Sequence, residues 1–259
     1  MRELIIKVLK LFRLDSTAKR IRQQINLFAP ANLRSRRKKK EFYSQFITKG
    51  DLCFDVGANI GNRTEIFLKL GAKVIAIEPQ PQCAGFLKNI YKDINQVMIV
   101  EKALSDQPGE AEMMICDALT LSTLSKNWIT QVKKSGRFQN YKWDKTVMVP
   151  VTTLDRLIAE YGQPEFCKID VEGYEARVLK GLSQPIKIIS FEFVPELIEV
   201  CKESIVYLSN LGKYQFNYSL DESMKFALQY WVGQEEICNI LMHLDDKTIY
   251  GDIYAKLSS

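Results

Sequence analysis

The stretch from Leu52 to Glu78 constrains the fold of this chain more than any other. It begins with the short apolar run 52–56, which is typical of a buried parallel strand. The glycine turn 57–61 follows directly, then a helical pattern with Asn62 as its expected cap, then a second apolar run over 73–77. We therefore predict a β-α-β unit whose glycine turn lies at the carboxyl end of its first strand, where open α/β sheets bind ligands.

Acidic residues flank this turn and favour a cationic ligand. The spacing of the turn is G-x-x-x-G rather than the G-x-G-x-x-G of dinucleotide sites, and Asp55 precedes it. A carboxylate there is a poor neighbour for two phosphates and a good one for a cation. S-adenosylmethionine has no phosphate but carries a sulfonium, an α-amino group and a ribose diol. Glu78 is placed to accept both ribose hydroxyls; the alternative is that both acids merely cap helices or pair with lysines.

Two more acids follow later strands of the same predicted sheet. Asp170 ends a fourth core strand, 166–170, and Glu192 lies near the end of a fifth, 186–193. Together with the two acids above, they place four carboxylates at the ends of four parallel strands on one rim, which favours a site over chance. The single histidine, His243, lies in a helical pattern with an apolar face, where we expect a packed or surface residue.

Composition narrows the class of protein. The 259 residues suffice for one large α/β domain plus an appendage, and the net charge of +5 is modest. The six cysteines are scattered with no C-x-x-C spacing, which favours reduced cysteines and a cytoplasmic location over a disulfide framework or a zinc site. No apolar run approaches the length of a membrane span.

Residues 1–40 read as a basic helical appendage to a domain over 41–259. The apolar residues of 1–30 recur at helical spacing, so this segment is expected to pack on its own domain, to dimerise or to lie on an anionic membrane surface. Packing is the preferred interpretation. The basic run 34–40 lacks interleaved aromatic residues, which favours a solvated helix face over a nucleic-acid patch.

Two further segments are candidates for ligand contact. Ser105 and Asp106 follow the third predicted strand and are candidates to meet the adenine amino group, although the sequence D-Q-P-G from 106 equally favours a plain turn. Periodicity then fails over 117–145, a stretch long enough to be a lid or substrate loop. Its aromatic residues would either stack on a sugar or close a small core of the loop itself.

Four motifs, in their order along the chain, resemble the FkbM family of class I S-adenosylmethionine-dependent methyltransferases. They are D-V-G-A-N-I-G-N, I-E-P-Q-P, V-T-T-L-D and K-I-D-V-E-G-Y-E, and the resemblance covers about 41–192. It implies a Rossmann-like α/β fold with a seven-stranded, mostly parallel sheet, helices on both faces and an antiparallel last strand. It also implies O-methylation, usually of a sugar or natural-product hydroxyl.

The resemblance also assigns roles to residues of this sequence. The methionine end of the cofactor would be lined by Asp55, Gly57, Ala58, Asn59 and Gly61. The ribose would be held by Glu78, followed by Pro79, and the transferred methyl would meet the acceptor at Asp170.

The chemistry needs a group that accepts the proton of an acceptor hydroxyl, because that proton leaves as the new bond forms. Asp170 is the first candidate for this base and Glu192 the second; two neighbouring acids raise one pKa toward neutrality. The same pair would alternatively hold Mg²⁺. Two other functions stay open: a non-catalytic membrane-surface or assembly protein that keeps the fold, and a nucleic-acid methyltransferase. The second is disfavoured by the mild charge and by the lack of an N-P-P-Y-type motif.

Overall fold

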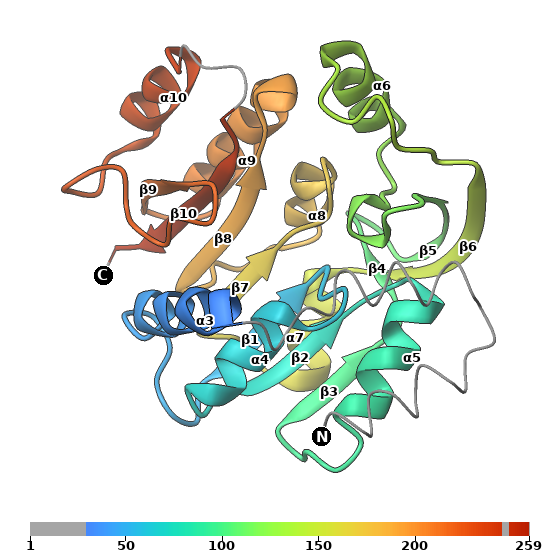
Figure 1. Cartoon of the computed structure of the whole chain (residues 1–259). Coiled ribbons are helices and arrows are strands. Elements are labelled where there is room, and N and C mark those ends of the chain that lie inside the picture. Colours follow the sequence, from blue (N-terminus) through green and yellow to red (C-terminus); the bar gives the residue numbers. More distant parts are fainter. Residues whose placement is uncertain (1–29, 245–248, 259) are drawn as a thin grey trace. The chain divides into compact units, whose positions relative to one another are not determined.

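The computed structural model describes residues 30–244 and 249–258 (Figure 1). Two compact units meet in sequence between Lys39 and Lys40, and the sheets belong to the second unit. Helix α3 (Pro30–Tyr43) carries the basic run. The segment 1–29, for which we predicted amphipathic helices, lies outside the described residues. In the part of the chain that is described, no helix has the length and apolar character needed to span a membrane.

A seven-stranded sheet forms the centre of the second unit, with strand order β3-β2-β1-β7-β8-β10-β9 (Figure 1). Every neighbouring pair is parallel except those that involve β10, which runs antiparallel between β8 and β9. This topology confirms the predicted fold class. The strands are β1 (Leu52–Val56), β2 (Lys73–Ile77), β3 (Val97–Val100), β7 (Phe166–Ile169), β8 (Ile188–Phe193), β9 (Tyr214–Leu220) and β10 (Gly251–Leu257).

Helices cover both faces of this sheet, because alternate strand residues are apolar on each side. On one face, Phe54 and Ile169 join a core with residues of the later helices. On the other face, Val74 and Phe166 pack with residues of the early helices. The first set of helices is α7 (Leu154–Tyr161), α8 (Glu175–Lys180), α9 (Ile198–Leu211) and α10 (Gln234–Met242); the second includes α4 (Asn62–Lys69), and α5 (Pro81–Ile90) packs near it on Ala76.

A three-stranded sheet and two short helices interrupt the parallel sheet between β3 and α7. Strand β6 (Lys145–Thr152) pairs with β4 (Ala103–Leu104) in parallel and with β5 (Gly109–Ile115) antiparallel. Between β5 and β6 lie the 3-10 helix η1 (Leu119–Leu121) and helix α6 (Lys126–Ser135). The segment predicted as irregular therefore contains a regular helix, whose N-cap Ser125 accepts a hydrogen bond from the Trp128 amide.

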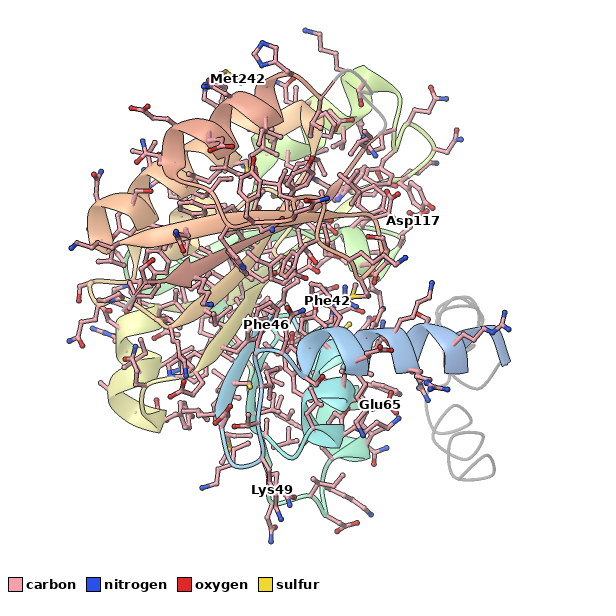
Figure 2. The ribbon with its side chains drawn as sticks, turned by 90° about the vertical axis from the view of Figure 1, so that its left-hand side faces the viewer. Phe42, Phe46, Lys49, Glu65, Asp117 and Met242 are labelled. Atoms are coloured by element: carbon pink, nitrogen blue, oxygen red, sulfur yellow. The ribbon has the colours of Figure 1, made fainter. Side chains whose placement is uncertain are left out.

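An aromatic cluster fastens the end of α3 to the sheet. Phe42 and Phe46 lie beside the last turn of this helix (Figure 2). Both rings contact Tyr254 of β10 and Phe226, with centroids 5.1 to 6.0 Å apart. These contacts pack the end of α3 against β10.

Candidate functional site

The turn between β1 and α4 is held against the end of β7 by a glycine. Gly57 has a φ of 81°, and a Cβ built on it would lie 1.8 Å from the carbonyl oxygen of Asp170. No other residue fits this approach. Gly61 also has positive φ, 84°, and is the N-cap of α4, so the expected cap at Asn62 is wrong: Asn62 is the first helical residue. Ala58 is buried in this turn.

Glu78 lies buried directly after β2 and is fixed by main-chain donors. Its Oε2 accepts the amide of Asn59 at 2.7 Å, and its Oε1 accepts the amide of Gln80 at 2.8 Å. Burial raises the pKa of this carboxyl to about 7, against the lowering effect of the two amides. Pro79 is half-buried between them. The carboxylate keeps lone pairs free for hydroxyl donors.

Asp55 is the last residue but one of β1 and is also buried. Its Oδ2 accepts the hydroxyl of Thr64 at 2.5 Å, and burial raises the pKa of the carboxyl. Near Glu78, the side-chain oxygens of Asn59 and Gln80 are buried without a hydrogen-bond partner. Two acids and two orphaned acceptors suit a ligand rich in donors and positive charge, so these residues fit S-adenosylmethionine.

Asp170, Glu172 and Glu192 form a second carboxylate group at the carboxyl ends of β7 and β8. One oxygen of each lies within 4.8 Å of the others. Burial, then the charges of neighbouring acids, raises the pKa of Glu172 and of Glu192 well above the usual range. The predicted pair of Asp170 and Glu192 is therefore a trio. Carboxylate oxygens at this spacing are the kind of ligand that a hard divalent cation takes.

Glu172 was missed by the sequence analysis, and so was its neighbour Glu175. Glu172 has a φ of 55° in the tight turn that follows β7. Buried Glu175 closes this turn by accepting the amides of Val171 and Gly173, both at 3.2 Å, and burial raises its pKa to about 7. Glu172 and Glu175, the two glutamates of D-V-E-G-Y-E, are thus part of the turn that follows Asp170.

Lys168 lies behind the trio and was also missed. Its side chain is fully buried on β7, and its Nζ lies 2.9 Å from Oδ1 of Asp252 and 3.4 Å from Oδ2 of Asp170. Burial opposes the charge on this ammonium, yet the carboxylates of Asp170 and Asp252 raise its pKa.

Ser105 and Asp106 lie directly after β4, and both interact with other side chains of the protein. The Ser105 hydroxyl is 2.9 Å from Oδ1 of Asp106 and 3.3 Å from the hydroxyl of Tyr174. Asp106 is paired with Arg177 at 2.7 Å, and the hydrogen bond from Ser105, then that from Arg177, lowers the pKa of its carboxyl. Their predicted contact with adenine stays a prediction.

The aromatic residues of 117–145 close a small core of their own. The ring of Trp128 is fully buried, and its centroid lies 5.7 Å from that of Phe138 and 5.9 Å from that of Trp143. Arg137 ties this segment to Glu196 at 2.8 Å, just after β8. Of the two alternatives for these aromatics, the structure favours packing over open stacking surfaces. His243 is exposed at the end of α10, with its Nδ1 beside the Asn239 carbonyl, as expected.

The methyltransferase FkbM domain matches residues 55–227 of this chain. The chain belongs to the FkbM methyltransferase family. The match confirms the family recognised in the sequence and extends beyond 192, where the resemblance seen in the sequence ends.

A hexuronic acid methyltransferase, AglP of Haloferax volcanii, is 27% identical over 147 residues, which are 56% of this chain and 55% of that protein. The chain therefore matches little more than half the length of this relative.

Solved structures give weaker likenesses. A precorrin-6y C5,15-methyltransferase of Geobacter metallireducens superposes with a TM-score of 0.46 at 11% identity, covering 86% of this chain and 87% of that one. An S-adenosylmethionine-dependent O-methyltransferase of Thermotoga maritima gives a TM-score of 0.40 at 11% identity, covering 86% and 66%. Scores this low support no argument about function.

Proposed function

We propose that this chain is an S-adenosylmethionine-dependent methyltransferase that acts on a hydroxyl of a sugar or glycan. Membership of the FkbM family supports methyl transfer. The relative described as a hexuronic acid methyltransferase supports a sugar acceptor. The observation that carries the proposal is a continuous acidic rim at the carboxyl edge of a parallel sheet, the edge where such sheets bind ligands.

The rim runs from one end of the ligand site to the other. Burial, and to a smaller extent the charge of Asp55, raises the pKa of Glu78. Burial, and to a smaller extent the charge of Asp170, likewise raises the pKa of Asp55. Asp170 continues to Glu192 through the carboxylate trio. In this proposal Glu78 accepts the ribose hydroxyls, and Asp55 with the turn 57–61 lies at the methionine end.

When bound, S-adenosylmethionine supplies a methyl group on a positively charged sulfur. The chain's own task is to position the acceptor hydroxyl in line and to take its proton. Asp170 is suited to this, because 37% of its side chain is exposed while the neighbouring turn is rigidly bonded. Glu192 is the alternative base, because its carboxyl belongs to the same cluster as Asp170.

The charge of the rim bears on the acceptor class. Three clustered carboxylates repel an acceptor that is itself a carboxylate and accept a neutral hydroxyl as donor. A divalent cation held by Asp170, Glu172 and Glu192 would reverse this preference, because its positive charge would attract an anionic acceptor. Mg²⁺ is therefore the second candidate for the same carboxylates.

Methyl transfer from labelled S-adenosylmethionine to a panel of neutral sugars and hexuronic acids tests the proposal. The panel is run with Mg²⁺ and again with a chelator. We expect neutral sugars to be methylated by the wild type, and the Asp170→Asn variant to bind S-adenosylhomocysteine normally but to lose turnover. Turnover at the wild-type rate in Asp170→Asn would remove this residue as the base, and methylation confined to uronic acids with Mg²⁺ would favour the cation site.

A further inference from the structure

A buried lysine sits behind the acidic rim. The Lys168 side chain has no exposed surface and donates to Oδ1 of Asp252 at 2.9 Å and to the carbonyl of Ile169 at 3.2 Å. Its third neighbour is Oδ2 of Asp170 at 3.4 Å. This ammonium therefore joins a residue of the proposed methyl-transfer site to β10, two strands away in the sheet.

Such an arrangement is a poor way to stabilise a fold. Taking Lys168 and the Asp252 carboxylate out of water costs several kcal/mol per ion, and apolar residues of similar volume often serve as well or better. The surrounding positions are also polar: Ser190 is the register partner of Lys168, and Ser219 that of Asp252. Both serine hydroxyls are buried and without a hydrogen-bond partner. Polar serines therefore occupy positions beside this lysine where apolar side chains would pack the sheet face.

The two carboxylates that contact Lys168 differ in burial. Asp252 has only 8% of its side chain exposed and anchors the ammonium from inside, whereas Asp170 has 37% exposed and reaches the rim. The ammonium therefore holds one oxygen of Asp170 inward, leaving the other side of the carboxylate toward solvent. Carboxylate oxygens of Glu172 and Glu192 lie within 4.8 Å of an Asp170 oxygen, so Lys168 is the attractive partner and the two glutamates are the repulsive partners of the same carboxylate.

We propose that Lys168 is a positioning residue for methyl transfer: anchored by Asp252, its ammonium fixes the orientation in which the Asp170 carboxylate meets the acceptor hydroxyl. This inference rests on the proposed function of the rim. It assigns the pair Lys168–Asp252 a role that is distinct from holding the sheet together.

The decisive variant is Lys168→Met/Asp252→Asn. Removing the lysine alone would leave Asp252 as an uncompensated buried charge and destabilise the chain strongly; the double variant removes both charges and leaves only Asp170 without its partner. A crystal structure of this variant is expected to show Asp170 turned away from its wild-type orientation. An unchanged orientation of Asp170 would overturn the inference, and this comparison needs no acceptor.

Kinetics with an acceptor from the sugar panel gives the second readout. We expect kcat to fall by at least about tenfold, because small misplacements of a reacting group cost that much or more. The affinity for S-adenosylhomocysteine, measured by calorimetry, should change by less than about threefold (~0.7 kcal/mol). A merely structural ion pair predicts the opposite, namely normal kcat once the double variant has folded.

Two control variants keep the rim intact. Lys187→Met removes an exposed lysine that pairs with Glu165 at 2.7 Å near the start of β8, and Ser190→Ala removes the buried hydroxyl beside Lys168 without changing a charge. Both should keep kcat within about twofold of the wild type. A Ser190→Ala variant as impaired as the double variant would overturn the role of the charge. Absence of methyl transfer by the wild type would defeat the proposed function but leave the crystallographic comparison decisive for Lys168.

Discussion

The two ends of the acidic rim differ in the groups that surround their carboxyls. At the cofactor end, both oxygens of Glu78 are met by main-chain amides that the β1–α4 and β2–α5 connections hold in place. At the acceptor end, Asp170, Glu172 and Glu192 crowd together, and the buried cation beside them is Lys168. The main-chain donors fix Glu78 as an acceptor of hydrogen bonds, whereas burial and the neighbouring acids raise the pKa of Glu172 and of Glu192.

This difference predicts different consequences for binding and for chemistry. Loss of a carboxylate at the cofactor end should cost affinity, because the ligand's donors lose their acceptor. Loss of a carboxylate at the acceptor end should spare affinity and relieve repulsion. The following predictions test that contrast.

The largest effect is expected from Glu78→Ala. Without this carboxylate the amides of Asn59 and Gln80 lose their acceptor and the ribose loses its anchor, so the affinity for S-adenosylhomocysteine should fall at least about 100-fold (~3 kcal/mol). Calorimetry measures it, and Asp55→Ala should behave alike. The control is Glu101→Ala, which removes an exposed acid paired with Lys88. Unchanged affinity in both Glu78→Ala and Asp55→Ala would defeat the assignment of the cofactor site.

A smaller, pH-dependent effect follows from the raised pKa of Glu78. Because this carboxyl has a pKa of about 7, much of it is protonated at pH 6 and ionised at pH 8. Ribose hydroxyls bond more strongly to the ionised form, so affinity for S-adenosylhomocysteine should rise by about tenfold between these pH values. The Glu78→Gln variant should show a flatter profile than the wild type. Parallel profiles in the two proteins would contradict the role of Glu78.

Much of the fold could be predicted from local pattern, because the strongest signals are local. The bounds of β1 and β2 agree with the predicted 52–56 and 73–77, and those of β7 and β8 lie within the predicted 166–170 and 186–193. Each is a run whose apolar spacing and flanking turn residues agree with one another. Helix α6 was not predicted, since its capping serine and its buried Trp128 give a signal only once the loop's own core is known.

Only the site residues that lie near the ends of predicted strands could be identified from the sequence. Asp55, Glu78, Asp170 and Glu192 follow apolar runs, so the parallel sheet brings them to one edge. Lys168 escaped notice because a lysine within F-C-K-I reads as an interruption, and its partner Asp252 is 84 residues away. Contacts of that separation depend on the register of β10 against β8, which no local pattern specifies.

A stability measurement tests the acceptor end. The pKa of Glu192 is raised in the folded state, so the folded chain binds more protons than the unfolded chain above the usual pKa of 4.5. Its contribution to stability is therefore present at low pH and is lost as the pH rises. Glu192→Gln should raise the free energy of unfolding by about 1 kcal/mol at pH 8, with a smaller gain at pH 5.

Urea unfolding at the two pH values measures this gain. Glu199→Gln, which changes a largely exposed acid paired with Lys202 on α9, is the matched control and should leave stability unchanged at both. If Glu192→Gln is no more stable than the wild type at pH 8, the carboxylates do not repel one another as the trio requires.

The smallest effect is expected away from both ends, where the segment 117–145 docks beside the rim. Arg137 pairs with Glu196 at 2.8 Å, and the Ser135 hydroxyl donates to the same carboxylate at 2.7 Å. Arg137→Gln keeps a donor but removes the charge, so this docking should weaken by less than about 1 kcal/mol.

Hydrogen exchange should quicken over α6 while the strands stay protected. Because the aromatic core of Trp128, Phe138 and Trp143 is unchanged, global stability should hold. A loss of protection that spreads into β7 and β8 would show that this segment supports the acceptor end, and would end the division of the rim into two independent regions.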